Sequence, residues 1–404
     1  MAGPLIFVSR LVRLPVLGAD GVPIGRLEDV VLAPGGPGGP PRVLGFVAEV
    51  QRRHIFVNAN RVVEINSSGA HMGTGTVDLR RFELRPGELL TRRSVLNRRV
   101  NGQVVDDVAL GATTEPKGWE VGAVSLSSAG LLRRRRAGRL VPWTEVAILF
   151  DTGPMGRQVA ELRELHPAEL ASTVAALPPE RRRTLAQALE DERLADLLEE
   201  LPEEEQVRLI ESLDVDRAAD VLEAMEADDA ADLLAELPSE ERNELLAAME
   251  PAEARPLRRL LTYEGDTAGG LMTPEPLIVV PDATVAEVLA RMRERDLPPA
   301  LAAQTFVVEP PTETPTGRYL GWVNFQRLLR EPPGSTVGSC LEGDPVAVRP
   351  DLSELEVARR LAAYDAIAVP VCDDAGRLVG AVTVDDVLDR VLPRDWRGRV
   401  RRAP

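Results

Sequence analysis

The sequence predicts a multidomain protein with an all-β N-terminal part, a central stack of short α-helices and a C-terminal pair of α/β domains. Three observations predict this order. Short alternating runs dominate the first 150 residues, an apolar residue recurs every twelve residues in the middle, and one sequence of strands and helices occurs twice near the end. At 404 residues the chain is long enough for two to four domains with their own cores.

The first 150 residues contain the same pattern twice, in the segments 16–32 and 95–110. Each has a glycine-containing hairpin followed by a strand with an Asp-Val pair, as in Asp29-Val30 and Asp107-Val108. This pattern resembles the PRC-barrel family. The resemblance implies two small β-barrels in tandem, over residues 1–85 and 86–152.

Residues 157–264 are predicted to form a superhelix of short, separate helices. In an unbroken helix a twelve-residue step would turn the apolar stripe by about 120° per repeat, and prolines stand at several joints, as at Pro202 and Pro238. The repeated apolar positions are Leu165, Leu177, Leu189, Leu201, Leu213, Met225, Leu237, Met249 and Leu261.

The helical stack carries the acidity of the whole chain. Residues 157–264 contain 29 acidic residues and 12 arginines, whereas the complete chain has a net charge of −16. Acids in the first turn of a helix offset the helix dipole, but many of these acids lie further along. Such a surface favours cations and argues against a nucleic-acid partner.

Beyond residue 264, an extended segment, a helix, two strands and a helix occur twice, over residues 270–332 and 336–392. This order predicts a tandem α/β pair.

The motif Tyr263-Glu-Gly-Asp-Thr-Ala-Gly-Gly-Leu-Met-Thr-Pro-Glu275 joins the acidic stack to this pair, and the second repeat contains Gly380-Ala-Val-Thr-Val-Asp-Asp-Val-Leu-Asp389. Together they resemble the cytosolic region of MgtE magnesium transporters, which has a superhelical N domain followed by two CBS motifs. The resemblance implies a homodimer formed through the CBS domains, and Mg²⁺ bound between facing acidic surfaces. Because the family continues into a membrane domain where this chain stops, it also implies a sensor without a pore of its own.

Four aspartates are the candidate metal ligands: Asp228, Asp229, Asp232 and Asp365. The spacing of Asp228 and Asp232 places them on one face of a helix, and Asp365 lies in the Tyr-Asp turn of the second CBS motif. Carboxylates suit Mg²⁺, but they do not exclude Ca²⁺ or Mn²⁺. Ordinary solvated charge is the alternative explanation for each residue.

Adenine-nucleotide binding, of ATP or AMP, is a second hypothesis, because CBS pairs often hold such ligands. Gly380, Thr383 and Asp386 fit the family pattern, in which glycine admits a phosphate, threonine donates to it and the carboxylate accepts from ribose hydroxyls. The alternative is structural, since Thr383 followed by two aspartates would also cap a helix.

We therefore expect a non-catalytic, cytoplasmic, Mg²⁺-responsive regulator; a nucleotide-sensing scaffold with an acidic protein-docking surface is the alternative. The sequence contains no run of 18 apolar residues, so it predicts no membrane span. It also contains no set of residues that indicates an enzyme active site. A separate membrane transporter is the partner that the resemblance implies.

Overall fold

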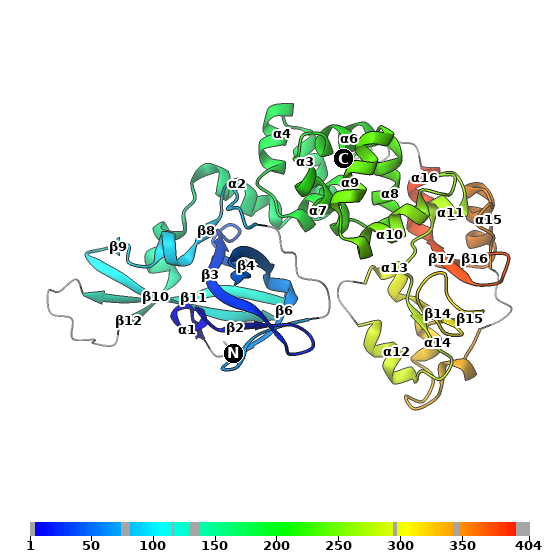
Figure 1. Cartoon of the computed structure of the whole chain (residues 1–404), viewed down its shortest axis with the longest axis horizontal. Coiled ribbons are helices and arrows are strands. Elements are labelled where there is room, and N and C mark those ends of the chain that lie inside the picture. The colour runs from blue at the N-terminus through cyan, green and yellow to red at the C-terminus, as the bar shows by residue number, and fades with distance from the viewer. Residues whose placement is uncertain are drawn as a thin grey trace, which may run out of the picture. The chain divides into compact units, whose positions relative to one another are not determined.

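The structure is a computed structural model, and it describes residues 5–73, 81–114, 117–128, 138–293, 297–342 and 347–392. The arginine-rich segment 393–404 lies outside the described residues. The chain divides into two compact units, residues 1–189 and 190–404. Figure 1 labels many of the helices and strands of both units.

The first unit is built on one sheet, which has twelve strands within the described residues. Its main order is β1-β10-β11-β4-β3-β2-β7-β6, with β12 on β11, β5 on β4, β8 on β3 and β9 on β10. The strands are β1 (Ile6–Phe7), β2 (Pro15–Leu17), β3 (Pro23–Ala33), β4 (Arg42–Val50), β5 (Arg53–Asn58), β6 (Val62–Asn66), β7 (Gly69–Met72), β8 (Leu89–Leu90), β9 (Arg99–Val100), β10 (Gln103–Thr114), β11 (Lys117–Ser128) and β12 (Arg139–Pro142).

The two similar halves of this unit, one on each side of residue 85, exchange their first strands. The short strand β1 of the first half pairs with the long strand β10 of the second half, and the short strand β8 of the second half pairs with the long strand β3 of the first half. One hydrophobic core takes residues from both, including Leu27 and Phe46 from the first and Val105 and Leu110 from the second. The two barrel-like halves therefore share a sheet and a core.

An aspartate completes each exchange. After its strand, each half has a short helical turn, α1 (Val8–Leu11) in the first and η2 (Thr91–Val95) in the second. Asp29 Oδ1 accepts the backbone N–H of Arg92 in η2 at 2.9 Å, and Asp107 Oδ1 accepts that of Ser9 in α1 at 3.0 Å. Each carboxylate thus satisfies a backbone donor at the start of the other half's turn.

Three helices complete the first unit: α2 (Gly153–Arg163), α3 (Pro167–Ala175) and α4 (Pro179–Ala186). They follow the helical turn η3 (Trp143–Phe150), and a further short turn, η1 (Ala59–Arg61), lies between β5 and β6. An ion pair of 2.8 Å between Arg42 of β4 and Glu164 at the end of α2 connects the helices to the sheet.

The second unit begins with six helices that alternate between two rows. Each helix contacts the helix two places further along, so α5, α7 and α9 form one row, and α6, α8 and α10 form the other. Repeat positions such as Leu201, Met225 and Met249 are buried between them, which confirms the prediction of short, separate helices. Their bounds are α5 (Asp191–Glu199), α6 (Glu203–Ile210), α7 (Val215–Ala224), α8 (Ala227–Glu236), α9 (Ser239–Ala248) and α10 (Pro251–Leu260).

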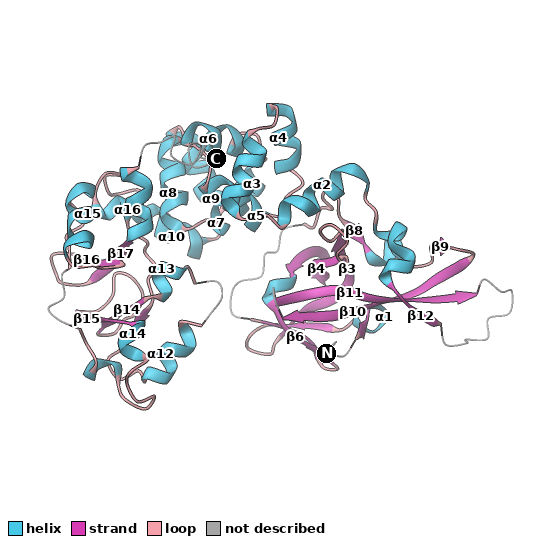
Figure 2. Cartoon of the chain, turned by 180° about the vertical axis from the view of Figure 1, so that it is seen from behind, coloured by secondary structure: helices cyan, strands magenta, loops and turns pink. Residues whose placement is uncertain are grey.

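Two small sheets follow, and together they form the predicted α/β pair (Figure 2). One has the order β13-β14-β15 and the other is β16-β17. A single core joins them, with Phe306 and Tyr319 from the first and Leu378 and Ala381 from the second. The elements are β13 (Ile278–Val279), α12 (Val285–Arg291), α13 (Pro299–Ala302), β14 (Gln304–Val308), β15 (Tyr319–Asn324), α14 (Phe325–Leu328), η4 (Val337–Ser339), α15 (Glu354–Ala363), β16 (Ala368–Cys372), β17 (Leu378–Thr383) and α16 (Val384–Val391).

The glycine pair of the motif 263–275 lies in the short helix α11 (Ala268–Leu271). A Cβ on Gly269 would lie 2.6 Å from ring atoms of Tyr263, and one on Gly270 would lie 2.5 Å from the carbonyl oxygen of Glu264. Because no side chain fits at these distances, only glycine lets α11 fold back onto the preceding turn. α11 contacts α8, α15 and β17, so it joins the helical stack to the second α/β repeat.

We predict that Asp29→Ala and Asp107→Ala each lower the free energy of unfolding of the β region by about 1–2 kcal/mol, the usual effect of losing a side-chain cap. Asp29→Asn keeps an acceptor oxygen and should cost less. Scanning calorimetry of the full chain measures the change. Glu64→Ala, which removes an exposed carboxylate from β6, is the control, and an equal effect of all three alanine variants would contradict the capping role.

Candidate functional site

Three aspartates of the helical stack lie on α8. Asp228 is only 6% exposed, and its Oδ1 has no hydrogen-bond partner among the described residues. Asp229 and Asp232 are half-buried. An ionised carboxylate that is withdrawn from water without a partner is costly. The structure therefore brings three of the four predicted metal ligands together on one unfavourably charged face.

A glutamate from another helix adds to this charge. Glu226 precedes α8, and its backbone N–H donates to Oε1 of Glu199, near the end of α5, at 2.8 Å. The same contact recurs between the backbone N–H of Glu250 and Oε1 of Glu223, at 2.6 Å. The two pairs are offset by two repeat units, so the superhelix places a glutamate against the start of the helix three places further along, where the helix dipole favours negative charge.

The first turn of α16 brings more carboxylates from the second α/β repeat. Asp386 accepts hydrogen bonds from the backbone N–H of Thr383, at 3.2 Å, and from its hydroxyl, which forms a capping box. Figure 1 shows α16 beside α8. The negative charge of Asp386 acts on Asp228, Asp229 and Glu226. Like charges from two different domains thus meet at this contact.

One cation among the described residues crosses the contact: Arg390 of α16 forms an ion pair with Asp232 of α8. Burial still raises the pKa of Asp232 above its usual value, although the Arg390 charge and hydrogen bond lower it. A single guanidinium is therefore insufficient to offset the surrounding negative charge.

Burial is the largest cause of the raised pKa values in this cluster, and repulsion between carboxylates adds to it. The pKa values of Asp228 and Asp229 are well above the usual range. Burial and the charges of Glu199, Asp386 and Asp385 raise the pKa of Glu226 to about 7, although this residue keeps an exposed side. Burial raises the pKa of Asp386 to about 6 against the hydrogen bonds from Thr383.

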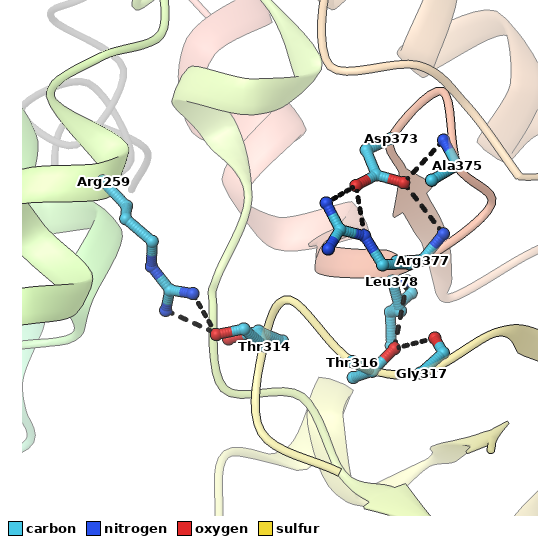
Figure 3. A network of polar contacts seen from close by, with 8 residues as sticks. All are labelled: Arg259, Thr314, Thr316, Gly317, Asp373, Ala375, Arg377 and Leu378. Atoms are coloured by element: carbon cyan, nitrogen blue, oxygen red, sulfur yellow. Dashed lines mark hydrogen bonds and ion pairs between the residues drawn. The ribbon is translucent and has the colours of Figure 1, made fainter. Parts of the chain in front are cut away.

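Contacts outside the cluster hold the helical stack against the α/β pair. The Arg259 guanidinium of α10 donates to the carbonyl and to the hydroxyl oxygen of Thr314, in the loop before β15 (Figure 3). The Thr314 hydroxyl in turn donates to the carbonyl of Pro274 at 2.8 Å. Figure 3 also shows Thr316, whose hydroxyl accepts from the Leu378 backbone N–H at 3.1 Å. The Arg259 bonds thus connect the helical stack to the first α/β repeat, and the Thr316 bond connects the two repeats.

Of the other predicted site residues, Asp386 belongs to this cluster, whereas Asp365 and Gly380 lie elsewhere. Asp365 follows α15 in the left-handed region, with φ 49°, and is exposed. It is not among the groups whose charge acts on Asp228, Asp229 or Asp232. Gly380 lies in β17, where a Cβ would be 2.6 Å from the carbonyl oxygen of Thr273, so this glycine has a packing reason to be there. Thr383 and Asp386 bond to each other.

Glu199, Glu226 and Asp385 also belong to the acidic cluster, although the sequence did not single them out as site residues. Glu199 and Glu226 carried a usable signal, because the pair Glu223 and Glu250 repeats them after two units of twelve. Asp385 adjoins Asp386 in the first turn of α16. The sequence predicts a nucleotide-binding role for Asp386, so it did not point to this turn as part of an acidic cluster.

Among the described residues, no three Asp, Glu, His or Cys side chains converge closely enough to hold one metal ion. The cluster nevertheless fits a hard divalent cation in kind, because its donors are carboxylate oxygens and Asp228 contributes a buried atom without a partner. Mg²⁺ usually keeps several of its waters, so a few carboxylates suffice.

Comparison with known proteins identifies this part of the chain. Residues 165–266 match the MgtE intracellular N domain, and residues 268–334 and 337–393 match the CBS domain. The crystal structure of the cytosolic domain of the Mg²⁺ channel MgtE in complex with ATP is 33% identical, with a TM-score of 0.52; the match covers 61% of this chain and 98% of that one. The chain belongs to the MgtE family.

Two further relatives give the same result. The magnesium transporter MgtE of Thermus thermophilus is 39% identical over 141 residues, which are 35% of this chain and 30% of that protein. The crystal structure of the soluble part of a magnesium transporter is 25% identical, with a TM-score of 0.53, over 59% of this chain and 91% of that one. The match with the Thermus thermophilus transporter thus spans less than a third of the length of that protein. No helix in the described part of this chain has the length and apolar character to cross a bilayer.

We predict that acid stabilises the contact between α8 and α16. Because the pKa values of Glu226, Asp386, Asp228 and Asp229 are raised in the folded protein, the folded state binds protons that the unfolded state releases. Stability should therefore rise as the pH falls from about 8 to about 5, on the order of 1 kcal/mol or more, since one pKa unit is about 1.4 kcal/mol.

Chemical denaturation in the presence of a chelator measures this pH dependence. A variant with Asp228→Asn and Asp386→Asn should have a shallower slope than the wild type. A slope that is equal in both, or that has the opposite sign, would contradict the prediction.

Proposed function

We propose that this protein responds to Mg²⁺ by closing its helical MgtE N region onto the second CBS domain. The observation that carries the proposal is the burial of Asp228 and Asp229 of α8 together with Asp386 of α16, with raised pKa values and mutual repulsion. A divalent ion would supply the positive charge that offsets this repulsion. Without it, the facing carboxylates favour separation of the two surfaces.

Within this proposal, α8 supplies Asp228, Asp229 and Asp232, and α16 supplies Asp386, so that an ion held between them connects two domains. Asp365 stays a predicted ligand that would have to approach from the turn after α15. The Thermus thermophilus relative is a magnesium transporter, which supports Mg²⁺ over other divalent ions, although carboxylates by themselves do not select it.

We further propose that the protein is a non-catalytic, cytoplasmic homodimer whose partner is a separate membrane transporter. Exposed apolar side chains on the CBS pair support the dimer: Leu329 is 64% exposed, and Leu388 and Val391 of α16 are about half exposed. Large apolar side chains in water often mark a protein interface.

Adenine-nucleotide binding is the second candidate function, and it is supported by the ATP complex of the related cytosolic domain. Gly380, Thr383 and Asp386 are the residues that would take part. Thr383 and Asp386 bond to each other in a capping box. A nucleotide would have to replace these hydrogen bonds before Asp386 could accept from ribose hydroxyls. Sensing of Mg²⁺ and of nucleotide therefore both involve Asp386.

The proposed Mg²⁺ response predicts that the full chain binds Mg²⁺ in calorimetry and becomes more compact in small-angle scattering when a chelator is replaced by millimolar Mg²⁺. The double variant Asp228→Asn with Asp232→Asn should weaken binding at least tenfold, because it removes two carboxylates from the contact. The matched control is Glu240→Gln with Glu244→Gln, which removes an exposed pair with the same spacing from α9. Loss of binding in both double variants, or no response of the wild type by either method, would refute the proposal.

The nucleotide hypothesis predicts that ATP binds the full chain in the absence of divalent ions, and that Asp386→Ala weakens this binding at least tenfold. Asp385→Ala is the matched control, because it removes the neighbouring exposed carboxylate of the same helical turn. Calorimetry with ATP measures both affinities. Equal ATP affinity of the two variants would exclude the role of Asp386.

A further inference from the structure

The contact between α8 and α16 spans two helical turns that carry different charges. On α8, Asp228 and Asp232 are four residues apart, so they lie on one face of the helix. On α16, Asp386 and Arg390 have the same spacing. Burial raises the pKa of both α8 aspartates; the Asp386 charge raises the pKa of Asp228 further, whereas the Arg390 charge lowers that of Asp232. The contact therefore repels at one turn and attracts at the next.

The attractive turn is a direct ion pair between the helical stack and the second α/β repeat. The side chains of Arg390 and Asp232 are 32% and 41% exposed, so the pair is half-buried. Salt screens such a pair less than it screens a pair on the open surface. Because arginine stays protonated in proteins, its positive charge is a permanent part of the contact.

Asp232 is also one of the carboxylates that the proposed function gives to Mg²⁺. A carboxylate that already neutralises a guanidinium attracts a second cation less, and the guanidinium itself repels the ion. By linkage, each of the two cations weakens the binding of the other by the same factor. Arg390 and a divalent ion therefore compete for one side chain.

We propose that Arg390 is a built-in latch whose ion pair with Asp232 keeps part of the population closed, with α8 against α16, when no divalent ion is bound. The latch itself does not require Mg²⁺. Its competition with Mg²⁺ for Asp232, which rests on the proposed function, makes the protein less sensitive to the ion. Arg390 thus determines how far closure depends on Mg²⁺.

Small-angle scattering of the full chain in a chelator tests the latch. In Arg390→Gln, the ratio of closed to open molecules should fall at least threefold from that of the wild type, and Arg390→Lys, which keeps the charge, should fall less. The matched control is Arg208→Gln, because Arg208 lines the same groove but pairs with Glu204 on its own helix α6, at 3.1 Å. Equal ratios in the two glutamine variants would overturn the latch.

A double-mutant cycle identifies the partner of Arg390. In a background of Asp232→Asn, Arg390→Gln should change the closed-to-open ratio in chelator by less than 1.5-fold, because the ion pair is already absent. An effect as large as in the wild-type background would show that Asp232 is not the residue through which Arg390 acts, and it would overturn the proposal.

A variant that is merely misfolded is recognised by its response to Mg²⁺. In millimolar Mg²⁺, Arg390→Gln should become as compact as the wild type, with an unchanged circular dichroism spectrum. A variant that stays expanded while the wild type closes would overturn the latch, because Arg390 would then be needed for closure in every state.

Calorimetry with Mg²⁺ tests the competition. We expect Arg390→Gln to bind Mg²⁺ at least twofold more tightly than the wild type, since the ion no longer displaces or faces a guanidinium. An equal or lower affinity would overturn the competition. If the wild type does not bind Mg²⁺ at all, the proposed function fails, whereas the comparison of the variants in chelator still decides the latch.

Discussion

Like charges at the contact between α8 and α16 are the constraint on which the proposed behaviour of the second unit depends. Asp228, Asp229 and Asp386 are withdrawn from water close to one another, and their raised pKa values express the cost of ionising them together. Uncharged contacts such as that of α11 with α8 and β17 hold the same surfaces near each other. A contact in which packing attracts and charge repels is poised to respond to cations.

The acidic superhelix serves two purposes with one kind of residue. Most of its glutamates and aspartates belong to the helices themselves: they stand in first turns, or they accept a backbone N–H as Glu199 and Glu223 do. Where carboxylates of the second α/β repeat approach them, as at Asp228 and Asp229, their charge becomes costly. An acidic side chain thus stabilises a helix where water surrounds it, whereas at a domain contact the same side chain responds to ions. The difference arises because burial raises the free energy of an ionised carboxylate.

Much of the fold could be predicted from the sequence, because each part has its own periodicity. The twelve-residue repeat gave the short helices, and the motif 263–275 with the CBS signature gave the family. The exchange of β1 and β8 was not predictable, since the two similar segments are equally compatible with separate or shared sheets; the pairing depends on contacts of residues about 100 positions apart, such as Ser9 and Asp107. Of the candidate ligands, the three on α8 were found together because helical spacing fixes their face.

By itself, the sequence determined the kinds of domain, the acidity of the helical stack and the identity of the family, because these follow from local periodicity and short motifs. Tertiary structure alone decided which carboxylates meet. It placed Asp386 rather than Asp365 among the charges that act on α8, added Glu199 and Glu226, and paired Arg390 with Asp232. The physical reason is that burial and repulsion act through space between elements far apart in the chain, and no local pattern records those distances.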